Sequence, residues 1–119
     1  MADMMSTLIW GLKAATGLEV FPAPKPAGAS VPCITVQTIS DPMQDHNHSA
    51  GASIHMSRVQ ISHIGDWETV RHYVQTVQNY LEGNKTDFLS AISDGIYIER
   101  QEAEDLWTLI KGFYVQWKA

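Results

Sequence analysis

The feature that most constrains this chain is a change of hydrophobic period between Arg58 and Leu81. Residues 58–62 alternate polar and apolar side chains, which is the period of a half-buried strand. From residue 67 onward the apolar residues line one face of a helix: Trp67, Val70, Val74, Val77 and Leu81. A strand therefore leads into a helix, and a further strand-like run from Gly112 to Lys118 gives that helix a sheet to pack on.

The N-terminal third predicts another helix and two strands. Apolar residues recur at helical spacing from Met5 to Leu12, and Gly17 stands where such a helix would end. A short extended run is predicted from Leu18 to Phe21. Regular structure is then interrupted by a group of prolines: Pro22, Pro24, Pro26 and Pro32. The alternation from Cys33 to Ile39 predicts a second strand.

A polar segment from Asp41 to Ser53 separates the second strand from the third. It is rich in Asp, Asn, Ser, Gly and His, so it has too few apolar residues to form a core. We expect the strands on either side, Cys33–Ile39 and Ile54–Ile64, to pair as a long hairpin with this segment as a projecting loop. The apolar parity changes between Met56 and Val59, which predicts a bulge in the third strand.

The C-terminal part predicts a hairpin. Gly83 provides a stop for the second helix, and Thr86 with Asp87 would cap one short turn that carries Phe88, Leu89 and Ile92. A fourth strand opens at Ile96, and it pairs with the final strand. The sequence therefore predicts one α/β (α+β) domain over residues 1–119, in the order α-β-β-β-α-β-β. Two main helices would pack on a mostly antiparallel or mixed sheet of four to five strands.

Charge and cysteine content restrict the function classes. Eight Lys and Arg residues against thirteen Asp and Glu residues give a formal charge of -5, which disfavours binding to a nucleic-acid backbone. The basic residues do not cluster. Cys33 is the single cysteine, so the chain has no internal disulfide and a reducing compartment is expected.

Two groups of side chains resemble reaction centres, and neither predicts one. Asp45, His46 and His48 are metal-ligand types, but a polar loop gives no fixed geometry, so an interface is favoured over a metal site. Carboxylates cluster near the C-terminal hairpin: Glu99, Glu102, Glu104 and Asp105. Hairpin ends are charged because they are solvated, so an acidic rim is favoured over acid–base catalysis. No motif of nucleophilic or phosphate chemistry is present, and we expect no catalytic residue, cofactor or metal.

Aromatic residues point instead to contacts between subunits. Four Trp and four Tyr residues are many for a chain of 119 residues. Most should lie in the core, but surplus aromatics at edges and helix flanks often mark interfaces. Trp107 and Tyr114 are the candidates for that role. The candidates in the polar segment are Met43, Asp45, His46 and His48.

The order of these elements resembles the tail terminator proteins of long-tailed phages. The similarity begins with Leu8-Ile9-Trp10-Gly11-Leu12 followed by Val20-Phe21-Pro22, and it continues through Val31-Pro32-Cys33-Ile34-Thr35-Val36 and Arg58-Val59-Gln60-Ile61. The amphipathic helix and the terminal Gly112-Phe113-Tyr114-Val115-Gln116-Trp117 complete it. The resemblance spans nearly the whole chain and rests on the order and spacing of structural motifs.

The resemblance implies a structural virion protein and no reaction. Such proteins form a hexameric ring at the head-proximal end of the tail tube, stop tube polymerisation and offer a docking face for the head. The implied partners are other copies of the chain, the tail tube protein and a head-completion or connector protein, with assembly in the host cytoplasm. DNA would pass through the lumen without specific binding, and no membrane is involved. The segment from Asp41 to Ser53 is implied to reach a neighbour or the tube.

Charge fits such a conduit, because carboxylates facing the lumen would repel DNA phosphates during ejection. Glu102 and Glu104 are the candidates for that position. The sequence leaves three alternatives open: a head-completion or connector ring of the neck, a small metal-binding or enzymatic domain that uses Asp45, His46 and His48, and a plain dimeric binding domain.

Overall fold

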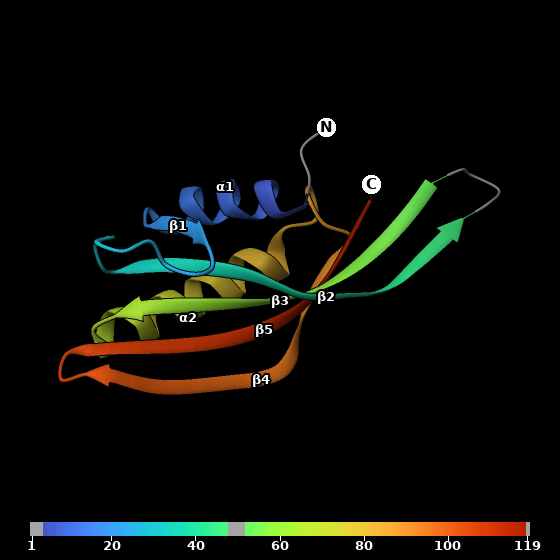
Figure 1. The fold of residues 1–119 in the computed structure, drawn as a ribbon. Coiled ribbons are helices and arrows are strands. Elements are labelled where there is room, and N and C mark those ends of the chain that lie inside the picture. The colour runs from blue at the N-terminus through green and yellow to red at the C-terminus, as the bar shows by residue number, and fades with distance from the viewer. Residues whose placement is uncertain (1–3, 48–51, 119) are drawn as a thin grey trace.

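The chain folds as a five-stranded sheet with both helices on one face (Figure 1). The computed structural model describes residues 4–47 and 52–118, with side chains at 4–39 and 55–117. Its elements are α1 (Met4–Thr16), β1 (Glu19–Pro22), β2 (Cys33–Asn47), β3 (Ala52–Gly65), α2 (Trp67–Gly83), β4 (Ser90–Ala103) and β5 (Leu106–Lys118). The strand order is β1-β2-β3-β5-β4, in which β1 and β2 are parallel and the other pairs antiparallel. The predicted fold class and element order are confirmed.

The two helices begin and end where their local chemistry requires. The N–H of Gly17, at φ 74°, donates to the Lys13 carbonyl at 2.8 Å and closes α1. The Asp66 carboxylate caps α2 by accepting from the Thr69 N–H at 3.2 Å. Hydrogen bonding from Thr69, first through its side chain and then through its N–H, lowers the pKa of Asp66. The helix stop predicted at Gly17 is confirmed.

One core lies between the helices and the sheet. Alternate residues of the strands meet the apolar stripes of both helices there, and its buried members are Met4, Leu8, Leu12, Val20, Ile34, Val36, Val59, Ile61, Val77, Leu81, Phe88, Ala91, Phe113 and Val115. Gly11 allows the close approach of α1 to α2, because a Cβ there would lie 1.7 Å from the Tyr80 hydroxyl. In the described part of the chain, no helix lies on the opposite face of the sheet (Figure 1).

The predicted loop from Asp41 to Ser53 is wrong for most of its length. β2 runs to Asn47 and β3 starts at Ala52, and these two residues are paired. We call residues 40–54 the arm; its described parts, residues 40–47 and 52–54, are paired strands that continue past the helices (Figure 1). Backbone pairing does not require apolar side chains, so the polar composition concealed these strands. Residues 48–51 lie outside the described residues.

The bulge predicted in β3 is also wrong in its position. Thr38 pairs with Val59, Ser40 with Arg58, and Met43 with Met56, so the extra residues lie in β2. By contrast, β3 stays in continuous register with β5. The parity change in β3 has another cause. Val59 faces the helices, whereas Met56 belongs to the opposite face of the same regular strand.

The fourth strand starts earlier than the sequence indicated. β4 begins at Ser90, so Ile92 lies in a strand and not in the predicted short turn. The reason is that Ser90 to Ser93 pair with Gln116 to Phe113 of β5. Register shifts by two residues between Ser93 and Tyr97.

Among the described residues, no helix is long and apolar enough to cross a membrane.

His63 is a buried polar residue beneath the helices. Its side chain is 1% exposed, and its Nδ1 lies 2.8 Å from the Leu109 carbonyl oxygen, which fixes Nδ1 as the donor. Within the described part of the chain, Nε2 has no hydrogen-bond partner. Burial lowers the pKa of His63 from 6.5 to about 4, with a further lowering by nearby Lys111.

This environment predicts a loss of stability in acid. Because the folded pKa of His63 is below the unfolded value, its contribution is complete above pH 6.5 and is lost as pH falls toward 4. The loss should reach about 3 kcal/mol at still lower pH. Urea unfolding at a series of pH values should show a shallower pH dependence for His63→Leu and His63→Gln than for the unsubstituted protein. Equal slopes in all three proteins would contradict this assignment.

Candidate assembly surfaces

No reaction centre is visible in the described part of the chain. Among the side chains that the structure describes, at residues 4–39 and 55–117, no group of three His, Cys, Asp or Glu is placed to hold a metal ion. Asp45 and His46 lie on the described backbone of the arm, and His48 lies outside the described residues. The surfaces available for binding are the arm, the two sheet faces and the ends of the sheet.

The arm brings together three of the predicted interface residues. Met43, Asp45 and His46 follow one another on the outer part of β2, where they pair with Met56, Ile54 and Ser53 of β3. The sequence of the arm, residues 40–54, contains two Asp residues and no Lys or Arg. Neither helix covers this hairpin (Figure 1).

The root of the arm is fixed by side chains that the sequence analysis did not single out. The rings of His55 and Trp117 are stacked with centroids 4.5 Å apart, and the Trp117 indole N–H donates to the Ser57 hydroxyl at 3.0 Å. These contacts join β3 to the end of β5, so the arm has a third strand at its base. The apolar C-terminal strand was the sequence signal that could have predicted this contact, because it pairs with the third strand.

Trp107 lies at the opposite end of β5, on the helix-covered face. It pairs with Gly65, and its ring lies 4.7 Å from that of Trp67 at the start of α2. Both rings are half-buried, and the Arg71 guanidinium lies over the Trp67 ring at 5.5 Å. The exposed part of this pair is available for contact.

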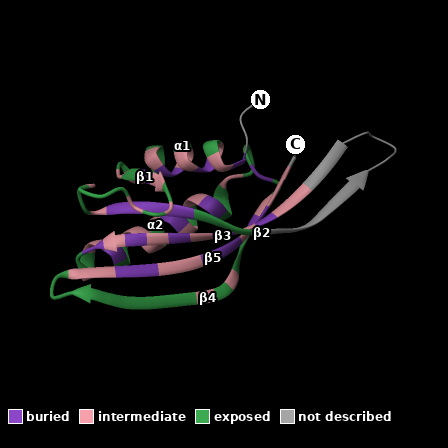
Figure 2. Cartoon of the chain, in the orientation of Figure 1, coloured by how far each residue is buried: buried purple, intermediate pink, exposed green. Residues whose placement is uncertain are grey.

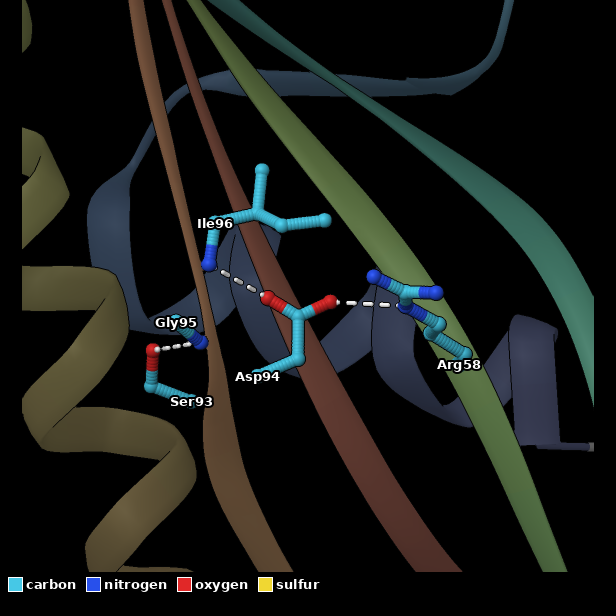
Figure 3. Close-up of polar contacts among 5 residues, drawn as sticks. All are labelled: Arg58, Ser93, Asp94, Gly95 and Ile96. Carbon is cyan, nitrogen blue, oxygen red and sulfur yellow. Dashed lines mark hydrogen bonds and ion pairs between the residues drawn. The ribbon is translucent and has the colours of Figure 1, made fainter.

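Tyr114 lies on the other face of the sheet, so the structure does not bring it together with Trp107. The Arg58 guanidinium lies over its ring at 5.6 Å. Arg58 Nε donates to Asp94 at 2.8 Å, and the second carboxylate oxygen of Asp94 accepts from the Ile96 N–H, also at 2.8 Å (Figure 3). The hydrogen bond to Asp94 raises the pKa of Arg58.

This ion pair crosses β5 and depends on a glycine. The Asp94 side chain is 0% exposed and comes from the bulge of β4, where Gly95 adopts φ 89°. A Cβ on Gly112 would lie 2.3 to 2.6 Å from the Asp94 carboxylate, so only glycine leaves room for it. The Asp94-Gly95 pair and the strand glycine Gly112 were the signals that the sequence analysis did not use.

Glu102 and Glu104 lie at the hairpin between β4 and β5, at the end of the molecule opposite the arm (Figure 1). Both are exposed, as are Glu99 and Asp105. Arg100 Nε donates to Glu102 at 2.6 Å. The expected acidic rim is present at this end.

A cleft opens between α2 and β4, and no sequence pattern predicted it. We call it the α2–β4 cleft. Its cavity has a volume of about 260 Å³ and is lined by Arg71, Val74, Gln75, Tyr97 and Lys111. Lys111 Nζ donates to Gln78 on α2, and the Tyr97 hydroxyl donates to Glu99 at 2.9 Å. Tyr97 is 47% exposed. The cleft offers two cations, an apolar wall and an aromatic ring beside an edge strand.

Comparison with known proteins supports the fold. No protein-family model matches the sequence, and no match is found among curated proteins. Among solved structures, the fold is similar to a chain in the virion of a native gene transfer agent particle, with a TM-score of 0.59 and 16% sequence identity. The match covers 99% of this chain and 87% of that chain. The architecture as a whole is therefore shared with a virion component.

The Asp94 ion pair yields a stability prediction. Gly112→Ala should destabilise the protein by about 1–3 kcal/mol, because the added methyl group displaces a buried carboxylate held by two hydrogen bonds. Gly83→Ala is the matched control, since nothing lies within 4 Å of its Cβ position. Urea unfolding measures both, and the cost of Gly112→Ala should shrink in an Asp94→Ala background. Equal tolerance of the two alanines would contradict the proposed packing.

Proposed function

We propose that this chain is a structural virion protein that forms a ring at the head-proximal end of a phage tail tube. The observation that carries the proposal is the shared fold with a virion chain over almost the full length of both proteins. The element order that resembles tail terminators is the order of the structure. The arm, the uncovered face of the sheet and the α2–β4 cleft are surfaces through which such a protein can bind its neighbours.

The geometry of the molecule suits ring closure. A closed ring with cyclic symmetry needs a heterologous interface, in which one patch of a subunit meets a different patch of the next. The arm extends from one end of an elongated molecule whose principal extents are 55 × 26 × 25 Å. Because the arm projects in one direction, it can contact the next subunit without receiving that subunit's arm in return. A hexamer is the number that the family resemblance implies.

In this role the ring stops growth of the tail tube and presents a docking surface to the head. Its partners are other copies of the chain, the tail tube protein and a head-completion or connector protein. The predicted interface residues in the arm, together with Trp107 and Tyr114, are proposed to make these contacts. The ring is placed in the virion after assembly in the host cytoplasm.

Tube length tests termination directly. Tubes assembled from the tail tube protein with this chain present should have a fixed length with a ring at one end, whereas tubes assembled without it should be longer and variable. Electron microscopy measures both distributions. Identical length distributions would contradict a terminator role, and bound stoichiometric metal in the purified protein would favour the metal-binding alternative.

The acidic hairpin end is proposed to face the lumen. Exposed carboxylates would keep DNA from adhering during passage, because like charges repel phosphate. Glu102→Lys with Glu104→Lys should slow DNA ejection from assembled virions, and Glu82→Lys on the exposed surface of α2 provides a charge-change control. If the double variant ejects DNA at the same rate as the unsubstituted protein, the proposal that Glu102 and Glu104 face the lumen is contradicted.

A further inference from the structure

We propose that the α2–β4 cleft is the receptor for the arm of a neighbouring copy of this chain. The inference rests on the proposed ring and adds the two surfaces that join its subunits. The two edges of the sheet differ in their capacity to take a partner strand.

The β1 edge is poorly suited to pairing, whereas the β4 edge is open. β1 has four residues and ends at Pro22, and three further prolines follow before β2. Proline has no N–H to donate, so such an edge resists addition of another strand. β4 has fourteen residues, and Figure 2 shows it exposed along most of its length. Its large apolar side chains Ile92, Tyr97 and Ile98 are 60%, 47% and 44% exposed.

The cleft beside this edge has the chemistry to bind an acidic segment. Arg71 and Lys111 place two cations at a cavity of about 260 Å³, which has room for one or two side chains. Val74 and Tyr97 provide apolar contact, and Gln75 adds an amide. Glu99 is the carboxylate held by Tyr97, so the cations exceed the acids in this group.

The arm is the complementary segment within this chain. Its sequence has Asp41 and Asp45 and no Lys or Arg, so it carries two negative charges, and it includes Met43. Among the described residues, β1 pairs with residues 33–36 of β2, and no strand pairs with the outer edge of β2 beyond residue 36. The arm therefore combines the outer edge of β2 with two acidic residues, and the cleft places Arg71 and Lys111 beside the outer edge of β4. If the β2 edge of one copy pairs with the β4 edge of the next, the acidic arm meets the two cations of the cleft. This is a head-to-tail contact that can repeat around a ring.

Disulfide trapping tests this contact in the full-length protein. Met43→Cys in the arm with Gln75→Cys in the cleft should give a ladder of cross-linked chains on non-reducing gels, when rings form on tail tubes under mild oxidation. Cys33 can stay, because it is 1% exposed and burial raises the pKa of its thiol, which keeps it unreactive. Met43→Cys with Ala14→Cys on the exposed surface of α1 is the matched control.

Charge reversal provides a second readout on the same trapped pair. Adding Arg71→Glu should lower the cross-link yield about fivefold, and adding Asp45→Lys as well should restore it. Rings on tube ends with no more cross-linking than in the Ala14→Cys control would overturn the arm–cleft contact while leaving the ring intact. Absence of any ring would overturn the proposed function, and the contact with it.

Discussion

The long ladder between β3 and β5 is the constraint on which the rest of the structure depends. These strands stay in register from the pair Ile54 and Lys118 to the pair Gly65 and Trp107, without a bulge. The ladder places Val59 beside Phe113, and both face the helices in the core. It also carries β3 past the helices, where the stacking of His55 on Trp117 fixes the base of the arm. One pairing therefore holds the core together and supports the projecting hairpin.

The second consequence of the ladder is an asymmetric sheet. β5 lies beside β3 in the sheet, so β4 lies beyond β5 and forms one long edge of the sheet. The short strand β1 forms the other edge. The bulge of β4 is fixed across β5 by the Asp94–Arg58 ion pair over Gly112. Helices cover only one face, so Tyr114 and Arg58 remain on an open face. These differences between edges, faces and ends give the molecule the unlike surfaces that a head-to-tail assembly needs.

The sequence predicted the parts of the fold that depend on hydrophobic period. The helix from Trp67 and the strand around Val59 were readable because each buries one face, and Gly17 marked a helix end through its positive φ. The extent of the arm was not readable, because backbone hydrogen bonds can extend a hairpin through polar residues. The short turn predicted at Phe88 failed because pairing with β5 outweighed local capping at Thr86.

The candidate site was predictable only in part. The arm residues follow one another in sequence, so a local pattern could identify them. The Asp94–Arg58 pair and the α2–β4 cleft join residues that are far apart in the chain, such as Arg71 and Lys111, and depend on strand order. A single sequence carries no direct signal of that order. The separation of Trp107 and Tyr114 onto opposite faces was readable from their odd spacing within one strand.

The proposed role of the arm is to join copies of this chain into a closed ring. It can be measured as the mass of protein bound per tube end when residues 41–53 are replaced by the two-residue turn Asn-Gly, which leaves the core and both helices in place. We expect a closed ring at each tube end with the complete chain and no ring with the shortened one, although both proteins fold. A shortened chain that still forms complete rings would contradict it.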